Sequence, residues 1–224
     1  VFFTLLFHTD NKYQTPPPYG KAGIITLNGQ DLERDTPIFL IDGWLFHDER
    51  TMGMATYIGE FSNLQRGEMG VSPHGRACYQ LTLRYDGMPQ IVSVDFPLLS
   101  FEYAVRVDGV LLAEGAGSGQ ITFQLTPGDH VLTVETLSKM GYYSGMYFPP
   151  ALGTVGTILG VNRIQGLAYA LAFVLPLALA VFTLFLWQTG GRFSRWFGIL
   201  CCCYAFYMFR YFVFLFCMPV ARYW

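Results

Sequence analysis

Residues 166–187 read GLAYALAFVLPLALAVFTLFLW and contain no charged side chain. As an α-helix rising about 1.5 Å per residue, this stretch spans roughly 33 Å, and the hydrocarbon core of a bilayer is about 30 Å thick. A second apolar stretch occupies residues 196–220, after a short basic loop at residues 188–195. The sequence therefore predicts an α-helical transmembrane hairpin in a multi-pass protein of the cell membrane.

Arginine placement predicts the orientation of the hairpin. The loop at residues 188–195 carries Arg192 and Arg195 and no acidic residue. Loops rich in arginine and lysine remain in the cytoplasm. We therefore expect this loop to be cytoplasmic and the long segment before the first span to be extracytoplasmic.

The remaining segments are assigned by composition. Residues 1–8 are mostly apolar but too few to cross a membrane, so we expect the end of an upstream signal anchor or signal peptide; a β-strand is the alternative. Residues 9–20 include three consecutive prolines and predict a linker. Residues 154–165 are expected to connect the front domain to the first span, and the chain is expected to be truncated after the second.

Charge and cysteine content exclude several classes of protein. The formal net charge is −2, and basic residues do not cluster as nucleic-acid binding requires. Cys78 is the single cysteine before the first span, so the front domain has no internal disulfide. The four histidines occur singly, without metal-ligand spacing, and we expect neither a metal site nor a cofactor.

Residues 21–153 alternate apolar and polar side chains with a period of two, which is typical of strands with one buried face. Asn28-Gly29, Asp42-Gly43 and Asp108-Gly109 are turn or hairpin dipeptides. The expected strands are residues 24–27, 38–46, 78–85, 91–96, 101–107, 121–125 and 131–136. This spacing predicts a mainly β domain, an antiparallel β-sandwich or jelly roll.

Three segments of this domain resemble motifs of one receptor family. They are YIGEFSN at residues 57–63, SPHGRACYQLTL at residues 72–83 and VRVDGVLLAEG at residues 105–115. Their order, followed directly by apolar spans, is similar to the galactose-binding-type jelly roll of bacterial seven-transmembrane receptors with diverse intracellular signalling modules. Phe61 stands where that family usually has tryptophan, and Asp108 where it usually has asparagine.

The resemblance covers roughly residues 39–153 and the spans that follow. It implies a domain that senses a small ligand, such as a carbohydrate, and helices that couple it to a cytoplasmic module. That module would be a histidine kinase of a two-component system or a similar unit, encoded beyond Trp224. The implied partners are the ligand, the bilayer, further transmembrane helices, the signalling module and, as an alternative to a monomer, a second copy.

A second hypothesis belongs to a different class. The domain would be a membrane-tethered module that binds carbohydrate or protein and transmits no signal. A membrane-anchored glycoside hydrolase is a third, for which Asp42, Glu60, Asp95 and Glu135 supply carboxylates. Their spacing selects no pair, so we expect no catalytic site in this chain.

Aromatic and polar side chains near turns are the candidate ligand contacts, because sugars stack on aromatic faces and bond to polar groups. The candidates are Trp44, Tyr57, Glu60, Asn63, Arg76, Tyr142 and Tyr143. Each has a structural alternative. Trp44 and Tyr57 would equally suit a core, Glu60 and Asn63 a turn, and the tyrosine pair at 142–143 a membrane surface.

Two further candidate sites are an arginine within the second span and a calcium site in the front domain. Arg210 lies within the second span, where a charge costs about 3 kcal/mol, and so it would contact another helix or reach the nearer membrane surface. A structural calcium ion held by Asp42 or Asp48 and loop carbonyls is compatible with the residue types.

Overall fold

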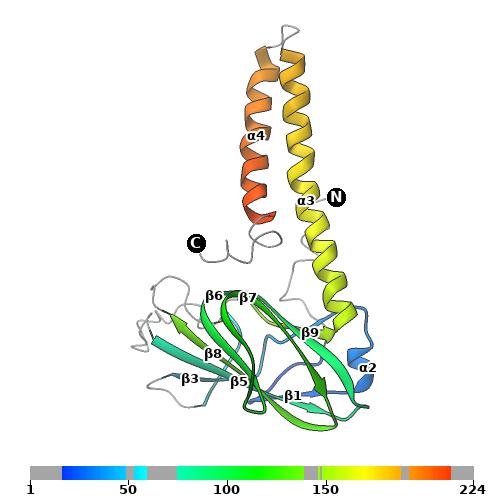
Figure 1. Ribbon diagram of the computed structural model, residues 1–224, viewed down its shortest axis with the longest axis vertical. Helices are drawn as coiled ribbons and strands as arrows, with labels where there is room; N and C mark the ends of the chain where they lie inside the picture. Colours follow the sequence, from blue (N-terminus) through cyan, green and yellow to red (C-terminus); the bar gives the residue numbers. More distant parts are fainter. Residues whose placement is uncertain are drawn as a thin grey trace. The chain divides into compact units, whose positions relative to one another are not determined.

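The computed structural model describes residues 17–48, 53–59, 75–138, 146, 148–187 and 192–212. For residues 48, 75, 97–101, 116–118, 138, 165, 187, 192–195 and 210–212 it describes the backbone alone. Contacts divide the chain into two units (Figure 1). The β unit ends at Val161, and the helical unit begins at Asn162.

Among its described residues, the β unit contains nine strands and the short helix α2, followed by the first turns of α3 (Val155–Trp187). They are β1 (Ile24–Leu27), α2 (Gly29–Leu32), β2 (Ile38–Phe39), β3 (Trp44–Asp48), β4 (Met54–Thr56), β5 (Gly75–Tyr85), β6 (Gln90–Val107), β7 (Val110–Leu125), β8 (Gly128–Ser138) and β9 (Ala151–Thr154). The strand order is β2-β9-β6-β8-β5-β3-β4, with β1 on β5 and β7 on β6. The mainly antiparallel β prediction is confirmed, except that β1 pairs with β5 in parallel.

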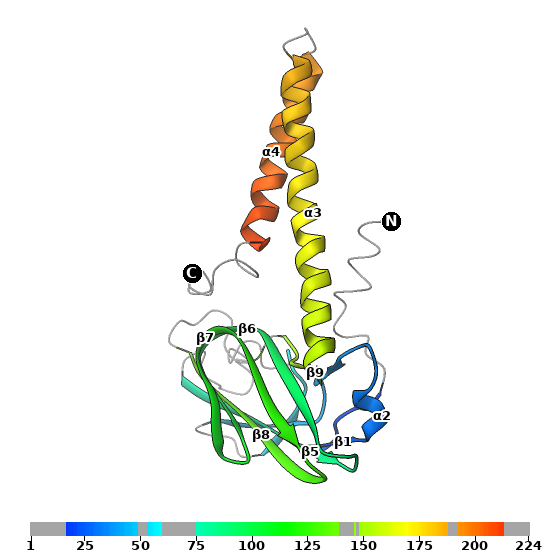
Figure 2. The same cartoon turned by 45° about the vertical axis from the view of Figure 1, so that its right-hand side comes forward.

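The long hairpin of β6 and β7 joins the two layers of the sandwich. The first part of β6 pairs with β9 from Val92 to Asp95, and its last part pairs with β8 from Glu102 to Val107. The register shifts between these parts, and β6 and β7 curve over together (Figure 2). The two strands predicted at residues 91–96 and 101–107 are therefore one bent strand, because bulges let a single strand change direction without ending.

Local side chains explain two of the predicted turns. Asp108 (φ 52°) and Gly109 (φ 80°) both adopt left-handed conformations, as a two-residue hairpin loop requires. Asn28-Gly29 is not a hairpin, and that prediction is wrong. The Asn28 side chain accepts the Asp31 amide at 2.9 Å, and Asp31 accepts the Asn28 amide at 3.0 Å, so Asn28 caps α2.

The core contains the apolar face of each strand. On β5, Ala77, Tyr79, Leu81, Leu83 and Tyr85 are buried, whereas the alternate residues are intermediate or exposed. They pack in one cluster with residues of β1, β3, β6, β7, β8 and β9. The period-two prediction for this strand is confirmed, because successive side chains of a strand point to opposite faces.

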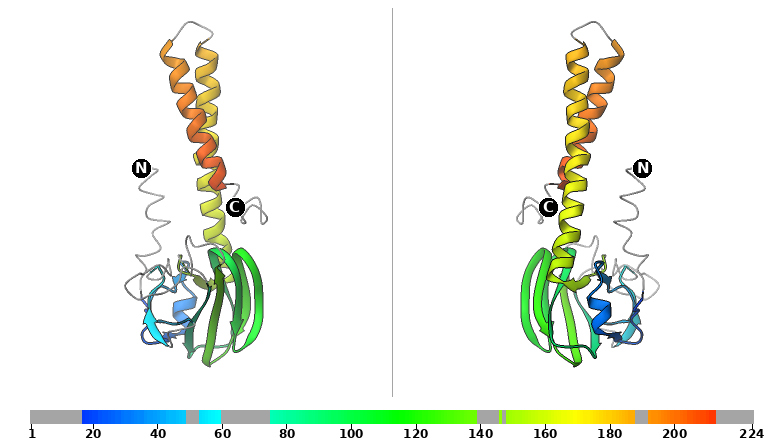
Figure 3. Two further views of the ribbon diagram at one scale, coloured as in Figure 1. Left: turned by 90° about the vertical axis from the view of Figure 1, so that its left-hand side faces the viewer. Right: turned by 90° about the vertical axis from the view of Figure 1, so that its right-hand side faces the viewer.

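The helical unit contains most of α3 (Val155–Trp187) and α4 (Arg192–Phe212). The two helices lie side by side (Figure 3). Phe173 and Phe209 stack at a centroid distance of 5.0 Å. A Cβ atom on Gly198 would lie 2.7 Å from Thr183 Oγ1, so a larger residue at this position would require the Thr183 side chain to move.

The helix boundaries differ from the predicted segments. The predicted connector at residues 154–165 is helical from Val155 onward, and the predicted loop at 188–195 is helical from Arg192. By length and composition, Val155–Leu186 is able to cross a membrane, whereas the described apolar part of α4, Trp196–Phe209, is shorter. Residues 213–220 of the predicted second span lie outside the described residues.

Candidate functional site

Trp44 belongs to the core and not to a binding surface. Its side chain has 0% exposure, and its indole Nε1 donates to the Leu40 carbonyl at 2.9 Å. Its ring meets Tyr79 edge to face at a centroid distance of 6.4 Å. Both the ring of Trp44 and its polar N–H group are thus in contact with protein. This supports the alternative role of Trp44, packing in the core, over the predicted contact with a ligand.

Tyr57 is the exposed aromatic candidate that the structure describes. Its residue exposure is 47%, and it follows β4 directly. The neighbouring backbone is fixed, because Ile58 is fully buried and its amide donates to the Ile41 carbonyl at 2.8 Å. An exposed ring on a fixed backbone loses little conformational freedom when a ligand stacks on it.

Met146 anchors the chain beside this segment. The Gly59 amide donates to the Met146 carbonyl at 3.3 Å, and the Met146 amide donates to the Tyr79 hydroxyl at 3.2 Å. Burial raises the pKa of Tyr79, and the Met146 amide opposes that rise, so the phenol stays neutral and accepts this bond. We define the candidate site as Tyr57, Ile58, Gly59 and Met146, with Tyr79 beneath them.

Four of the predicted site residues cannot be compared with this geometry. Glu60, Asn63, Tyr142 and Tyr143 lie outside the described residues, and their assignment stays a prediction. Arg210 lies in α4, where its side chain is likewise outside the description.

Arg76 does not lie beside Tyr57. Its backbone pairs with Leu137 near the beginning of β5, and it is exposed. Thr56, the residue before Tyr57, pairs with Trp44 of β3. On the other side of β3, Leu45 pairs with Gln80 of β5, which places Trp44 opposite Leu81 and five residues from Arg76. Five residues along a strand correspond to roughly 16 Å. The structure therefore does not unite Arg76 and Tyr57 in one small-ligand site.

The outer face of the sheet carries Glu135, one of the carboxylates considered for a glycoside hydrolase, and Cys78. Glu135 is exposed and pairs with Arg106 at 3.5 Å. Cys78 lies opposite Glu135, and burial together with the Glu135 charge raises the pKa of its thiol. A protonated thiol is a poor nucleophile. Among the described residues, no group of three His, Cys, Asp or Glu side chains is suited to hold a metal ion.

A charged cluster around His130 was not predicted. His130 Nδ1 lies 2.7 Å from Asp108 Oδ2, and its Nε2 lies 3.0 Å from the Thr126 carbonyl. In the protonated ring both nitrogens donate, to Asp108 and to the Thr126 carbonyl, whereas in the neutral ring Nε2 can accept the Thr126 amide at 3.4 Å. Burial alone would lower the pKa of His130, but the bonds to Asp108 and Thr126 and the charges of Asp108 and Asp129 outweigh it and raise the pKa.

This cluster predicts a pH dependence of stability. The contribution of His130 is fully present below its unfolded pKa, about 6.5, and is lost as pH rises through its higher folded pKa. Replacing His130 by glutamine is expected to lower the free energy of unfolding by about 1 kcal/mol at pH 5.5 and by less at pH 8.5. Urea unfolding of the detergent-solubilised chain at the two pH values measures this difference.

The matched control is Asp108→Asn. It keeps a side-chain oxygen for the Val131 amide, which Asp108 now accepts at 2.7 Å, and it tolerates the left-handed conformation. Because it removes the Asp108 charge and leaves the Thr126 bond and the Asp129 charge in place, it should reduce the pH dependence. An equal loss of stability at both pH values in His130→Gln would contradict the assignment.

Comparisons with known proteins give partial similarity. No family model and no curated protein matches the chain. Similar solved structures include a GH2 β-galacturonidase from Eisenbergiella tayi (19% identity, TM-score 0.38, covering 50% of this chain and 23% of that one). An FMN-binding β-glucuronidase from Faecalibacterium prausnitzii has 15% identity and a TM-score of 0.40, with coverage of 52% and 22%. A β-galactosidase homologue from Bacteroides fragilis has 17% identity and a TM-score of 0.41, with coverage of 52% and 23%.

The chain thus spans less than a quarter of the length of each of these three structures. The receptor resemblance stays a prediction. Similarity at this level leaves the function to be argued from the residues of the chain itself.

Proposed function

We propose that this chain is the ligand-binding portion of a membrane receptor, in which a β-sandwich outside the cell membrane binds a small ligand, such as a carbohydrate. Helices α3 and α4 anchor the sandwich and couple it to a cytoplasmic module. The cytoplasmic position of Arg192 and the extracytoplasmic position of the sandwich follow from the arginine rule.

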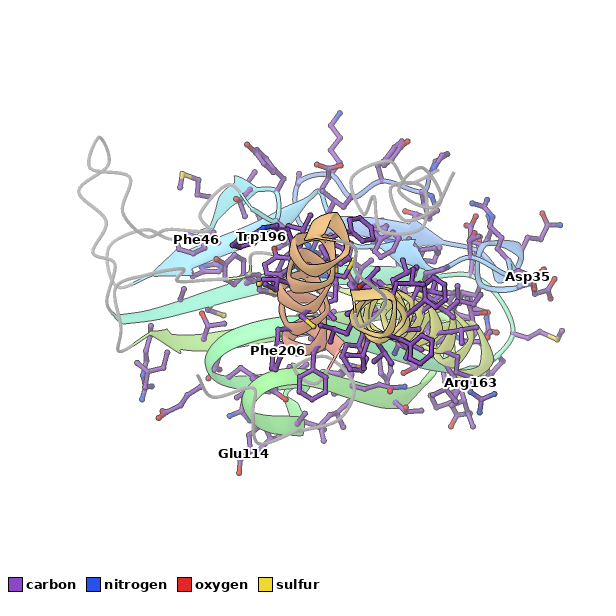
Figure 4. The ribbon with its side chains drawn as sticks, turned by 90° about the horizontal axis from the view of Figure 1, so that it is seen from above. Asp35, Phe46, Glu114, Arg163, Trp196 and Phe206 are labelled. Carbon is purple, nitrogen blue, oxygen red and sulfur yellow. The ribbon has the colours of Figure 1, made fainter. Side chains whose placement is uncertain are left out.

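The observation that carries the proposal is the outward apolar surface of α3. Leu167, Val181 and Phe185 are each more than 60% exposed and lie on different turns of the helix. On α4, Trp196 and Phe206 also project outward (Figure 4), with exposures of 70% and 77%. Water disfavours a continuous apolar surface of this kind, whereas hydrocarbon accepts it.

The start of α3 supports coupling as well as anchoring. Strand β9 ends at Thr154, and α3 begins at Val155, so no linker separates the last strand from the helix. Ile158, in the first turn, has 2% exposure and packs as part of the β unit. A ligand acts on such a helix only through different affinities for two arrangements of the protein.

The exposed ring of Tyr57 supports binding of a sugar-like ligand. Rings of this kind stack against the C–H groups of sugars, while polar groups bind their hydroxyls. The proposal assigns binding and not hydrolysis, because Glu135 is engaged with Arg106 and the described residues present no paired carboxylates at the candidate site.

Calorimetric titration of the full chain in nanodiscs tests this function. We expect at least one compound in a panel of sugars and peptidoglycan fragments to bind, and Tyr57→Ala to weaken that binding about tenfold by removing a stacking surface. Tyr142→Ala tests the residue predicted from sequence alone. Thr26→Ala, on the exposed face of β1, is the control and should leave the affinity unchanged.

Absence of binding across the panel would contradict a small carbohydrate ligand and favour a protein ligand. Binding without any change in the exchange of α3 amides would favour the passive tether over the receptor.

A further inference from the structure

Arg34 connects three segments of the β unit that are distant in sequence. Its Nη2 donates to Asp31 Oδ1 at 2.7 Å, in α2, and its Nη1 donates to the Pro17 carbonyl at 2.7 Å, where the described chain begins. Its own carbonyl accepts the Thr157 hydroxyl at 3.4 Å, in the first turn of α3. The chain before the sandwich and the chain after it therefore meet at one residue.

The carboxylate that holds Arg34 is itself fixed. Asp31 has 6% exposure, and its second oxygen accepts the Asn28 amide at 3.0 Å. The guanidinium has a planar fork of donors, so it can bond to this carboxylate and to the Pro17 carbonyl at once, which lysine cannot do in the same geometry. Arg34 therefore has a defined position relative to α2.

The backbone around Arg34 is held in part by these side-chain contacts. Residues 33–36 form bends between α2 and β2 and take part in no described strand ladder. The Glu33 amide donates to the Gly29 carbonyl at 3.2 Å, which holds the residue before Arg34 to α2. The guanidinium adds the bonds of Arg34 itself to Asp31 and to Pro17, and these bonds help to position the carbonyl that accepts the Thr157 hydroxyl.

The first turn of α3 presents Thr157 to this acceptor. Thr154 Oγ1 accepts the Thr157 amide at 3.2 Å, and the two hydroxyl groups lie 2.9 Å apart. Thr154 therefore acts as the N-terminal cap of the helix. Ile158 is buried beside it, so the turn is held by one apolar contact and by its polar bonds.

We propose that Pro17, Asp31, Arg34 and Thr157 form a clasp that holds the first turn of α3 against the segment by which the chain joins the sandwich. Opening the clasp frees that turn while the sandwich remains folded. The clasp is then the element that passes a shift of the sandwich to α3 in the proposed receptor, and this signalling role rests on the proposed function.

Hydrogen–deuterium exchange of the full chain in nanodiscs, without any ligand, tests the clasp. In Arg34→Ala, the amides of residues 21–24 and 155–161 are expected to exchange about tenfold faster, because the guanidinium bonds that hold both segments are lost. Peptides from β5 should keep their exchange rates. Arg84→Ala is the matched control, since the Arg84 guanidinium likewise donates two bonds, in its case both to the Asp129 carboxylate on the neighbouring strand β8.

A second variant separates the two sides of the clasp. Thr157→Val removes the hydroxyl, so exchange should rise in residues 155–161 and stay unchanged in residues 21–24. If Arg34→Ala loosens the whole β unit, Thr157→Val still tests whether the clasp holds the first turn of α3. Unchanged exchange at 155–161 in both variants, or an equal rise in Arg84→Ala, would overturn the clasp.

The two proposals fail in different ways. Faster exchange in the clasp variants, together with no ligand binding by the parent chain, leaves the clasp standing and removes the receptor role. Ligand binding with no effect of the clasp variants on residues 155–161 overturns the clasp and leaves the binding function.

Discussion

Replacing Trp44 by alanine is expected to lower the free energy of unfolding of the β unit by about 3–5 kcal/mol. The Trp44 indole is fully buried in the core cluster of the β unit. Its removal therefore leaves a cavity that the neighbouring strands cannot fill. It also leaves the Leu40 carbonyl without the indole donor. Chemical denaturation of the solubilised chain, followed by near-ultraviolet circular dichroism, measures the change.

Tyr57→Ala is the paired control for this prediction. Tyr57 is a neighbouring aromatic residue, but its ring is half exposed, so its loss should change stability by less than about 0.5 kcal/mol. The two variants should therefore separate stability from binding. Similar stability losses in both, or loss of ligand affinity in a Trp44 variant that stays fully folded, would contradict the assignment of Trp44 to the core.

A charge in the middle of α3 has the second largest expected effect. Leu175 is 56% exposed and lies beside Pro176, near the centre of the apolar stretch. Replacing it by arginine is expected to cost about 3 kcal/mol of membrane insertion, which reduces the inserted fraction roughly a hundredfold when insertion is near balance. A glycosylation-mapping assay of insertion measures that fraction.

The direction of the effect of Leu175→Arg distinguishes a helix in a bilayer from a helix in water. An exposed leucine on a helix in water would be replaced by arginine with no loss, and solubility would improve. Leu175→Ala, which adds no charge, should insert almost as well as the parent. If Leu175→Arg inserts equally well, or if the parent chain stays in solution without detergent, α3 does not cross a bilayer.

Local patterns predicted those parts of the fold that depend on near neighbours. The alternation on β5 fixed which of its side chains are buried, because the pleat imposes the period of two. Asp108-Gly109 predicted its turn, because both residues tolerate a left-handed backbone. The hairpin predicted at Asn28-Gly29 was wrong, because asparagine suits a helix cap as well as a hairpin. The capping contact with Asp31 decides for the helix cap.

The candidate site was less predictable. Trp44 and Tyr57 are both aromatic residues near turns, yet one is fully buried and the other half exposed, because burial depends on which strand covers each ring. The meeting of Gly59 with Met146 joins residues far apart in sequence. No sequence signal pointed to Arg34, whose role depends on three partners in separate segments.

By itself the sequence determined the strand periodicity of the front domain and an uncharged apolar stretch that is long enough to cross a bilayer. It also determined the turns whose conformation depends on one or two residues. Only the tertiary structure decided that β6 is one bent strand, that Trp44 is core and that Arg34 reaches Thr157. The physical reason is range: backbone preference acts over a few residues, whereas the Arg34–Thr157 bond joins positions 123 residues apart and exists only once the layers have packed.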